Sequence, residues 1–273
     1  MFGSGQVYLN LTFFSILPVI LILLYVYKRD KFPEPPRIVL TTFLLGIATT
    51  FPIGILIFAI EGFSETLNLG IEGTNFFMSF IRAAFIEETM KFLVLIFYCI
   101  HLDHFDEPMD AIVYGVAASL GFAVIENWEY VIGATNTGIE YAKDVAFVRS
   151  FTAIPLHALA GVYMGFFLMD AIFKKNNQKL NLFFSLFFPV CLHGLYDLIL
   201  FSNNISDYFI YVLLIVFIVR SIFIFKDQRA KQLSNNTKTS KSIPKTSDVV
   251  FSIILIFFIL LSVNLSFDYA LHN

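Results

Sequence analysis

Two adjacent glutamates, Glu87 and Glu88, lie close to Lys91 within an otherwise apolar stretch of the sequence. On a helix the glutamates precede Lys91 by four and three residues, so its ammonium group can reach both carboxylates. The surrounding run, residues 76–100, holds one further charged residue and is long enough to cross a bilayer. Ionisable side chains inside a membrane usually mark a pathway or a site. The trio therefore indicates a functional site, with self-neutralised helix packing as the alternative.

Three further apolar runs carry polar groups that such a site could use. They are Glu126 with Asn127 in residues 111–132, His157 in residues 149–173, and His193 with Asp197 in residues 180–201. His193 and Asp197 are one helical turn apart, so the carboxylate can fix the tautomer and orientation of the imidazole. At about 1.5 Å per residue, these groups and Glu87 reach overlapping depths, roughly 6–17 Å below the outer surface. We therefore expect four helices to bring them together.

The composition is that of an all-α polytopic integral membrane protein. The 273 residues are 58% hydrophobic and 14% charged, with a mean hydropathy of +0.77, which excludes a soluble domain of this size. The net charge of -3 gives no support for a nucleic-acid partner. Both cysteines lie in apolar runs, so packing in the core is expected for them rather than a disulfide.

About eight transmembrane helices are predicted from runs of spanning length. These runs are residues 7–27, 38–60, 76–100, 111–132, 149–173, 180–201, 208–225 and 249–265. The first run has no basic residue before it and a basic cluster after it, so we expect an uncleaved first span. The lipid bilayer of the cell membrane is thus an expected partner of this multi-pass chain.

The distribution of Lys and Arg predicts an N-terminus outside the cell. The loops after the first, fifth and seventh runs are basic, whereas residues 61–75 and 202–207 contain no Lys or Arg. We expect residues 1–225 to form a seven-span membrane domain that carries the predicted site. Residues 226–248 read as a disordered, basic cytoplasmic linker, and residues 249–273 as an eighth span with a short outer tail.

Several short motifs follow one another between residues 28 and 200. They are Glu87-Glu88-x-x-Lys91, Phe122-x-x-x-Glu126-Asn127, His157-x-x-x-Gly161, His193-Gly194-x-Tyr196-Asp197, Glu34-Pro35-Pro36 and the stretch from Asp106 to Gly115. Together they resemble the PrsW family of intramembrane proteases. The resemblance implies a bacterial-type membrane endopeptidase with membrane-anchored anti-sigma factors as a substrate class. PrsW proteins are distantly similar to CAAX prenyl endopeptidases, which have His where this chain has Glu126 and Asn where it has Asp197.

For peptide hydrolysis this resemblance suggests Glu87 as the general base, because such a reaction needs a base, a water and a stabilised oxyanion. Glu88 and Lys91 would hold charge and orientation. Glu126 would hold the water from a second helix.

The histidines are expected to act on the electrophilic side of the reaction. His193 would donate to the oxyanion, with Asp197 orienting it, and His157 would be a second electrophile or a ligand. Asn127 and Asp110 are assigned supporting roles, although Asp110 follows a proline at the start of a span and is also typical of a helix cap.

A zinc site is the alternative use of the same residues. His157, His193 and Glu126 make a set of two imidazoles and one carboxylate with an open position, and Glu87 or Glu88 would then be the base. The spacing matches no known zinc signature. The glutamate chemistry of the CAAX relatives favours the metal-independent form.

Two other classes of protein also carry buried polar groups. A secondary transporter would use Glu, His and Asp as a proton relay, but it should show an internal repeat, and the sequence shows none. A non-catalytic membrane scaffold would need the small residues Gly161 and Gly165 for helix packing, but not both glutamates and both histidines. The protease is therefore the favoured function.

Overall fold

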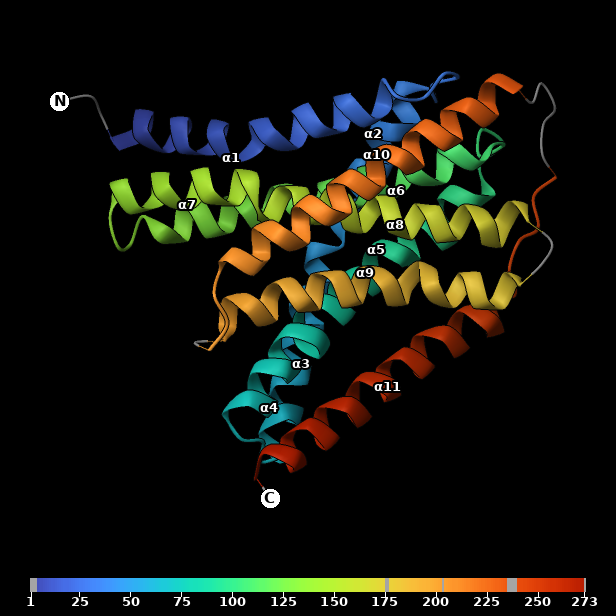
Figure 1. Cartoon of the computed structure of the whole chain (residues 1–273). Coiled ribbons are helices and arrows are strands. Elements are labelled where there is room, and N and C mark those ends of the chain that lie inside the picture. The colour runs from blue at the N-terminus through green and yellow to red at the C-terminus, as the bar shows by residue number, and fades with distance from the viewer. Residues whose placement is uncertain (1–3, 175–176, 203, 235–239, 273) are drawn as a thin grey trace.

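The computed structural model describes residues 4–174, 177–202, 204–234 and 240–272, and their regular structure is helical (Figure 1). The helices are α1 (Ser4–Tyr27), α2 (Pro36–Ala48), α3 (Thr50–Thr66), α4 (Ile71–Phe76), η1 (Phe77–Phe85), α5 (Ile86–Phe97), η2 (Cys99–His101), α6 (Pro108–Ala134), α7 (Ile139–Phe151), α8 (Ala153–Phe173), α9 (Gln178–Phe201), α10 (Tyr208–Ser234) and α11 (Thr246–His272). The prediction of an all-helical chain is confirmed.

Seven helical segments of the described chain are long and apolar enough to cross a membrane, with α2–α3 and α7–α8 each counted as one. They correspond to seven of the eight predicted runs. The remaining run, residues 76–100, is helical but not apolar enough to belong to these seven, because Arg82, Glu87, Glu88 and Lys91 all lie in it. Whether residues 76–100 form the eighth predicted span thus depends on how the structure accommodates these charges.

Helix α10 runs further than the predicted linker boundary. Residues 226–234 continue the helix to Ser234 instead of being disordered. Two glutamines in this extension, Gln228 and Gln232, are buried, and Gln232 donates to Asp30, so the extension packs on the body of the protein. Of the rest of the predicted linker, residues 235–239 lie outside the described residues.

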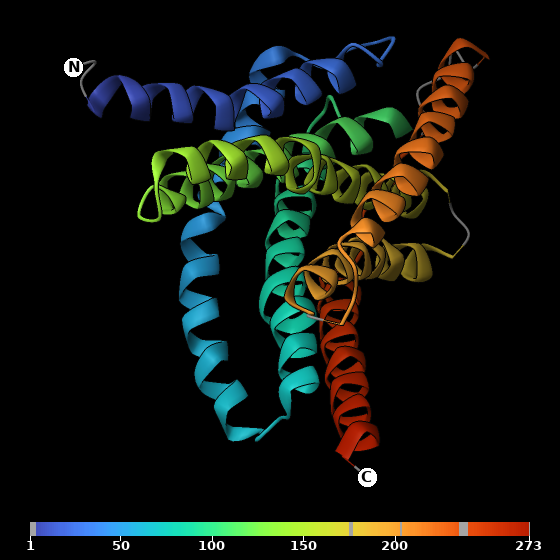
Figure 2. The same cartoon turned by 60° about the vertical axis from the view of Figure 1, so that its left-hand side comes forward.

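Helix α6 is the centre of the bundle and packs most extensively against α8, which in turn packs against α9. A Cβ atom at Gly161 or Gly165 of α8 would collide with the backbone of α6, and one at Gly115 of α6 would collide with α8. The two helices therefore meet backbone to backbone, as small residues allow in membrane bundles. Figure 2 shows α3, α5 and α11 running steeply away from the layer that contains α1 and α7.

The segment η1 connects α4 to α5 without a break and is wound as a π-helix. Such wide turns are rare and frequently occur at functional sites. Here η1 ends directly before Glu87 and Glu88. A Cβ at Gly194 of α9 would collide with the ring of Phe80, so this glycine lets α9 lie close to η1 and brings His193 beside α5.

Candidate active site

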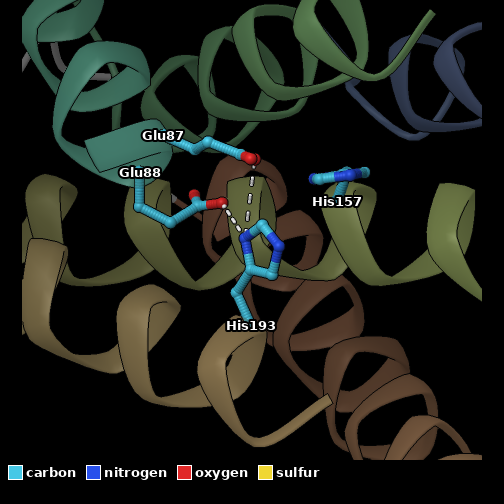
Figure 3. Close-up of side chains that lie close together, drawn as sticks. All are labelled: Glu87, Glu88, His157 and His193. Carbon is cyan, nitrogen blue, oxygen red and sulfur yellow. Dashed lines mark hydrogen bonds and ion pairs between the residues drawn. The ribbon is translucent and has the colours of Figure 1, made fainter. Parts of the chain in front are cut away.

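Four ionisable side chains from three helices meet inside the bundle. Glu87 and Glu88 come from α5, His157 from α8 and His193 from α9 (Figure 3). All four are buried, and each offers one ligand atom within 4.8 Å of the others. From the sequence we expected Glu87, Glu126, Asp197 and both histidines to meet, whereas the ligand atoms that lie together belong to Glu87, Glu88, His157 and His193, which we call the Glu/His cluster.

Lys91 is fully buried beside the Glu/His cluster. Its Nζ lies 2.7 Å from Glu88 Oε1 and 3.5 Å from Glu87 Oε2, so it reaches both carboxylates as the helical spacing predicts. The same Nζ lies 3.2 Å from His157 Nδ1 and 4.1 Å from the ring centroid of Phe122. One ammonium group therefore offsets the charge of two carboxylates that would be costly to bury alone.

His193 lies between carboxylates on both sides of its ring. Its Nδ1 is 2.9 Å from Glu88 Oε1 and 3.9 Å from Glu87 Oε2. Its Nε2 is 3.4 Å from Asp197 Oδ2, one turn along α9, which is the predicted pairing. The rings of His157 and His193 stand perpendicular with their centroids 5.1 Å apart. Asp197 is therefore placed to orient His193 from the side opposite to Glu88.

Glu126 lies behind His157 and outside the group of four ligand atoms. Its Oε2 is 2.7 Å from His157 Nε2 and accepts a hydrogen bond of 3.0 Å from Arg149 Nη2. The predicted metal set of Glu126, His157 and His193 is therefore not the set that the structure assembles, because Arg149 and the far side of the imidazole hold this carboxylate. A carboxylate in this position fixes the tautomer of the histidine in front of it.

Arg149 is a site residue that the sequence analysis did not identify. It lies at the end of α7, donates from Nε to Asn127 Oδ1 at 2.9 Å, and stacks on Tyr130 with its Cζ 4.0 Å from the ring centroid. Asn127 in turn donates to the carbonyl of Ser15 in α1 at 2.8 Å. The signal in the sequence is a lone arginine at the start of the apolar run 149–173.

Asp110 lies apart from the Glu/His cluster, at the start of α6. Its Oδ2 accepts hydrogen bonds from the backbone N–H groups of Glu107 at 2.8 Å and Asp106 at 2.9 Å. Together with the Glu107 side chain it forms a capping box. The helix-cap interpretation of this residue is confirmed.

Comparison with known proteins shows the family to which the chain belongs. The sequence model described as "PrsW family intramembrane metalloprotease" matches residues 34–222. The chain belongs to the PrsW family of intramembrane proteases. Protease PrsW of Bacillus subtilis (strain 168) is 40% identical over 201 residues, which are 73% of this chain and 85% of the relative. Protease PrsW of Clostridioides difficile (strain 630) is 30% identical over 234 residues, or 84% of this chain and 94% of the relative. No solved structure matches the chain.

Membership of the PrsW family confirms the resemblance read from the motifs and identifies a multi-pass bacterial membrane protease. In this PrsW chain, the double glutamate and the two histidine motifs supply the Glu/His cluster. The remaining acceptor of that cluster, Glu88 Oε2, is buried without a hydrogen-bond partner among the described residues. Two imidazoles and two carboxylates could together serve as general acid and base groups or as metal ligands.

Proposed function

We propose that this protein hydrolyses a peptide bond of a membrane-anchored protein substrate, of the anti-sigma-factor kind, at the Glu/His cluster. The observation that carries the proposal is the convergence of two carboxylates and two imidazoles at one buried point. Structural packing alone would not need four mutually close titratable groups, because each is costly to bury. The protease family supplies the reaction class.

Glu87 is the better candidate for the general base. Its Oε2 makes only long contacts, 3.5 Å to Lys91 and 3.9 Å to His193, and 9% of its side chain is exposed. Glu88 Oε1, in contrast, is held by Lys91 at 2.7 Å and by His193 at 2.9 Å. Glu87 is therefore freer to accept a proton from an attacking water, while Glu88 positions Lys91 and His193. From Nε2, whose contact with Asp197 is long at 3.4 Å, a protonated His193 would then donate to the developing oxyanion.

The imidazoles and carboxylates of the Glu/His cluster are also ligands that suit a divalent transition metal such as zinc, as the family description "metalloprotease" implies. His157, His193 and Glu88 would hold it, with the unpartnered Glu88 Oε2 as one ligand atom and Glu126 orienting His157 from behind. A bound zinc would supply a Lewis acid that polarises the scissile carbonyl. Lys91 Nζ contacts Glu88 and His157, so its ammonium group and a metal ion would compete for the same two side chains.

Cleavage of a membrane-tethered reporter by the purified protein in liposomes tests the function. Glu87→Gln keeps the size of the side chain but removes the base, and turnover should fall on the order of 10²-fold or more. Glu88→Gln should lower turnover similarly, because the amide loses its charge-assisted contacts. Glu140→Gln is the matched control, since that glutamate is exposed and pairs only with Lys143. Near-normal turnover in both site variants would exclude these roles.

Metal dependence is decided by elemental analysis combined with His157→Gln and His193→Gln. In a metal-independent site the amides can still donate hydrogen bonds, so partial activity should remain. In a zinc site each substitution removes a ligand, and activity should disappear together with bound metal. Zinc bound in a 1:1 ratio, whose removal stops cleavage and whose return restores it, would establish the metal form.

In the proposed orientation, the N-terminus lies outside the cell and the Glu/His cluster lies in the outer half of the membrane. The support is the predicted cytoplasmic location of the basic loops. In a variant with Cys99 and Cys191 replaced, a single cysteine at Thr137 should react with an impermeant reagent in intact cells, whereas one at Asn177 should react only after permeabilisation. The opposite pattern would reverse the topology.

A further inference from the structure

A second group of carboxylates gathers where the loop after α1 meets the start of α6. Asp30, Glu34 and Asp110 are buried there, with exposures of 6%, 5% and 0%, and Glu107 is half-buried beside them. One carboxylate oxygen from each of Asp30, Glu107 and Asp110 lies within 4.8 Å of the others. We call these four residues the acidic cluster.

Several oxygens of the acidic cluster accept hydrogen bonds from protein donors, whereas two buried oxygens have no such donor among the described residues. Asp30 Oδ1 accepts from Phe32 N at 2.9 Å, and Asp110 Oδ2 accepts the two backbone bonds of the helix cap. Glu34 Oε2 accepts from Tyr114 Oη at 2.6 Å. The opposite oxygens of the two aspartates, Asp30 Oδ2 and Asp110 Oδ1, are buried without a donor among the described residues, and the Glu34 carboxyl lies within hydrogen-bond reach of that of Asp110. Buried carboxylate oxygens are normally satisfied, so these two point to a ligand that donates or coordinates.

No protein cation neutralises the acidic cluster within the described residues, where none of its members forms an ion pair with Lys or Arg. The nearby basic side chains of the loop turn elsewhere: Arg29 stacks on Tyr25, and Lys31 lies over Phe32. Among the described residues, the nearby His104 partly offsets the charge of Glu34, and negative charge is thus concentrated in a partly dry place without a Lys or Arg partner.

We propose that the acidic cluster binds one hard divalent cation, Ca²⁺ or Mg²⁺, through Asp30 Oδ2, Asp110 Oδ1 and the carboxylate of Glu107. Its ligand group contains only oxygen atoms, which these cations prefer, and no imidazole or thiol, which zinc prefers. The site is separate from the Glu/His cluster. Asp110 lies 16 residues before Glu126, the residue of α6 that lies behind that cluster, which is roughly 24 Å along the helix.

The cation would fasten the end of α10 to the rest of the protein. Gln232 Nε2 donates to Asp30 Oδ1 at 2.7 Å and to Glu107 Oε1 at 2.5 Å, and its Oε1 accepts from Lys31 N at 3.3 Å. The amide therefore bridges two proposed ligands. A cation between them relieves their repulsion and holds them where Gln232 can bind both.

Two substitutions remove only the unpartnered oxygens. In Asp30→Asn the amide oxygen can keep the bonds from Phe32 N and Gln232, and an NH₂ group replaces Oδ2. In Asp110→Asn the amide oxygen can keep both cap bonds, and an NH₂ group replaces Oδ1. Each variant also removes one charge from the acidic cluster. Both should therefore fold, and without cation both should melt at or above the wild-type temperature.

The test is thermal denaturation of the full-length protein in detergent after treatment with EDTA, followed by addition of Ca²⁺, Mg²⁺ or Zn²⁺. At a hundredfold excess over the dissociation constant, Ca²⁺ or Mg²⁺ should raise the wild-type melting temperature by roughly 5–10 °C. Asp30→Asn and Asp110→Asn should lose this shift, and equilibrium dialysis with radioactive Ca²⁺ should show at least tenfold weaker binding. Asp170→Asn, at a carboxylate paired with Lys174, should keep it.

Measuring cation binding by the His193→Gln variant distinguishes this site from the Glu/His cluster. That variant should retain the Ca²⁺ or Mg²⁺ shift even if it loses all cleavage, so failure of one site does not imply failure of the other. The proposal is overturned if the wild-type protein binds neither Ca²⁺ nor Mg²⁺ at millimolar concentration. It is equally overturned if both aspartate variants bind as tightly as the wild type, or if acidification stabilises the wild type while neither cation does.

Discussion

Replacing Lys91 with methionine would remove one ammonium group from the most buried part of the molecule while keeping a side chain of similar length. Lys91 Nζ lies 2.7 Å from Glu88 Oε1, 3.5 Å from Glu87 Oε2 and 3.2 Å from His157 Nδ1. Methionine can make none of these contacts. Two buried carboxylates would then lack the cation that stabilises their charged forms.

Removing one partner of a buried ion pair typically costs about 3–5 kcal/mol. His193 Nδ1 remains 2.9 Å from Glu88 Oε1 and can carry a proton, so we expect the lower end of this range. A loss of about 3 kcal/mol corresponds to a melting temperature lower by roughly 6–12 °C in a chain of this size. Turnover should fall as well, because Glu88 loses the contact that positions it.

The assay is thermal denaturation of wild type, Lys91→Met, Glu88→Gln and the double variant in detergent. Glu88→Gln in the Lys91→Met background should restore part of the lost stability, because it removes a buried charge that no longer has its cation. Lys231→Met is the control: that exposed lysine pairs only with Asp227, and such surface pairs contribute roughly 0–1 kcal/mol. Wild-type melting of Lys91→Met, or additive losses in the double variant, would refute the reasoning.

Three further substitutions have defined outcomes. Arg149→Gln should lower turnover about 10- to 100-fold in the liposome assay, because it frees Glu126 from the guanidinium that holds it behind its histidine. Gly161→Leu should lower both melting temperature and turnover by forcing α6 and α8 apart, whereas Gly133→Leu, where a Cβ meets open space, should leave both near wild type. Tyr114→Phe should cost about 1 kcal/mol in thermal denaturation and leave turnover unchanged, since it removes only a hydrogen bond far from the Glu/His cluster.

Local helical geometry explains what could be predicted from the sequence. The reach of Lys91 to both glutamates, and of Asp197 to His193, depends only on spacing along one helix, and the structure shows both pairs. The apolar runs likewise predict helices because a bilayer leaves the backbone few other ways to satisfy its hydrogen bonds. Similar depths in neighbouring helices predicted that Glu87, His157 and His193 lie near one another, together with Glu126 and Asp197.

Contacts between helices explain what the sequence could not show. Glu126 has the chemistry of a metal ligand, but its place depends on Arg149, which arrives from a separate helix and holds it behind His157. The π-helical winding of η1 is equally invisible in the residue pattern, because it changes the register of a segment without changing its composition. The buried extension of α10 follows from Gln232 finding acceptors on two distant loops.

The two ion-pair partners of Glu88 differ in when they become available during synthesis. Because the chain is made from its N-terminus, α5 leaves the ribosome before α8 and α9, so Glu87 and Glu88 are synthesised before His157 and His193. Each charge at the centre of a membrane helix opposes insertion by about 2.5–3.5 kcal/mol. Lys91, three and four residues along the same helix, supplies a counter-charge that both glutamates can reach as soon as the helix forms. The neighbouring lysine can thus offset the charge of both glutamates first, and the histidines take up their contacts with them later, when α8 and α9 pack against α5.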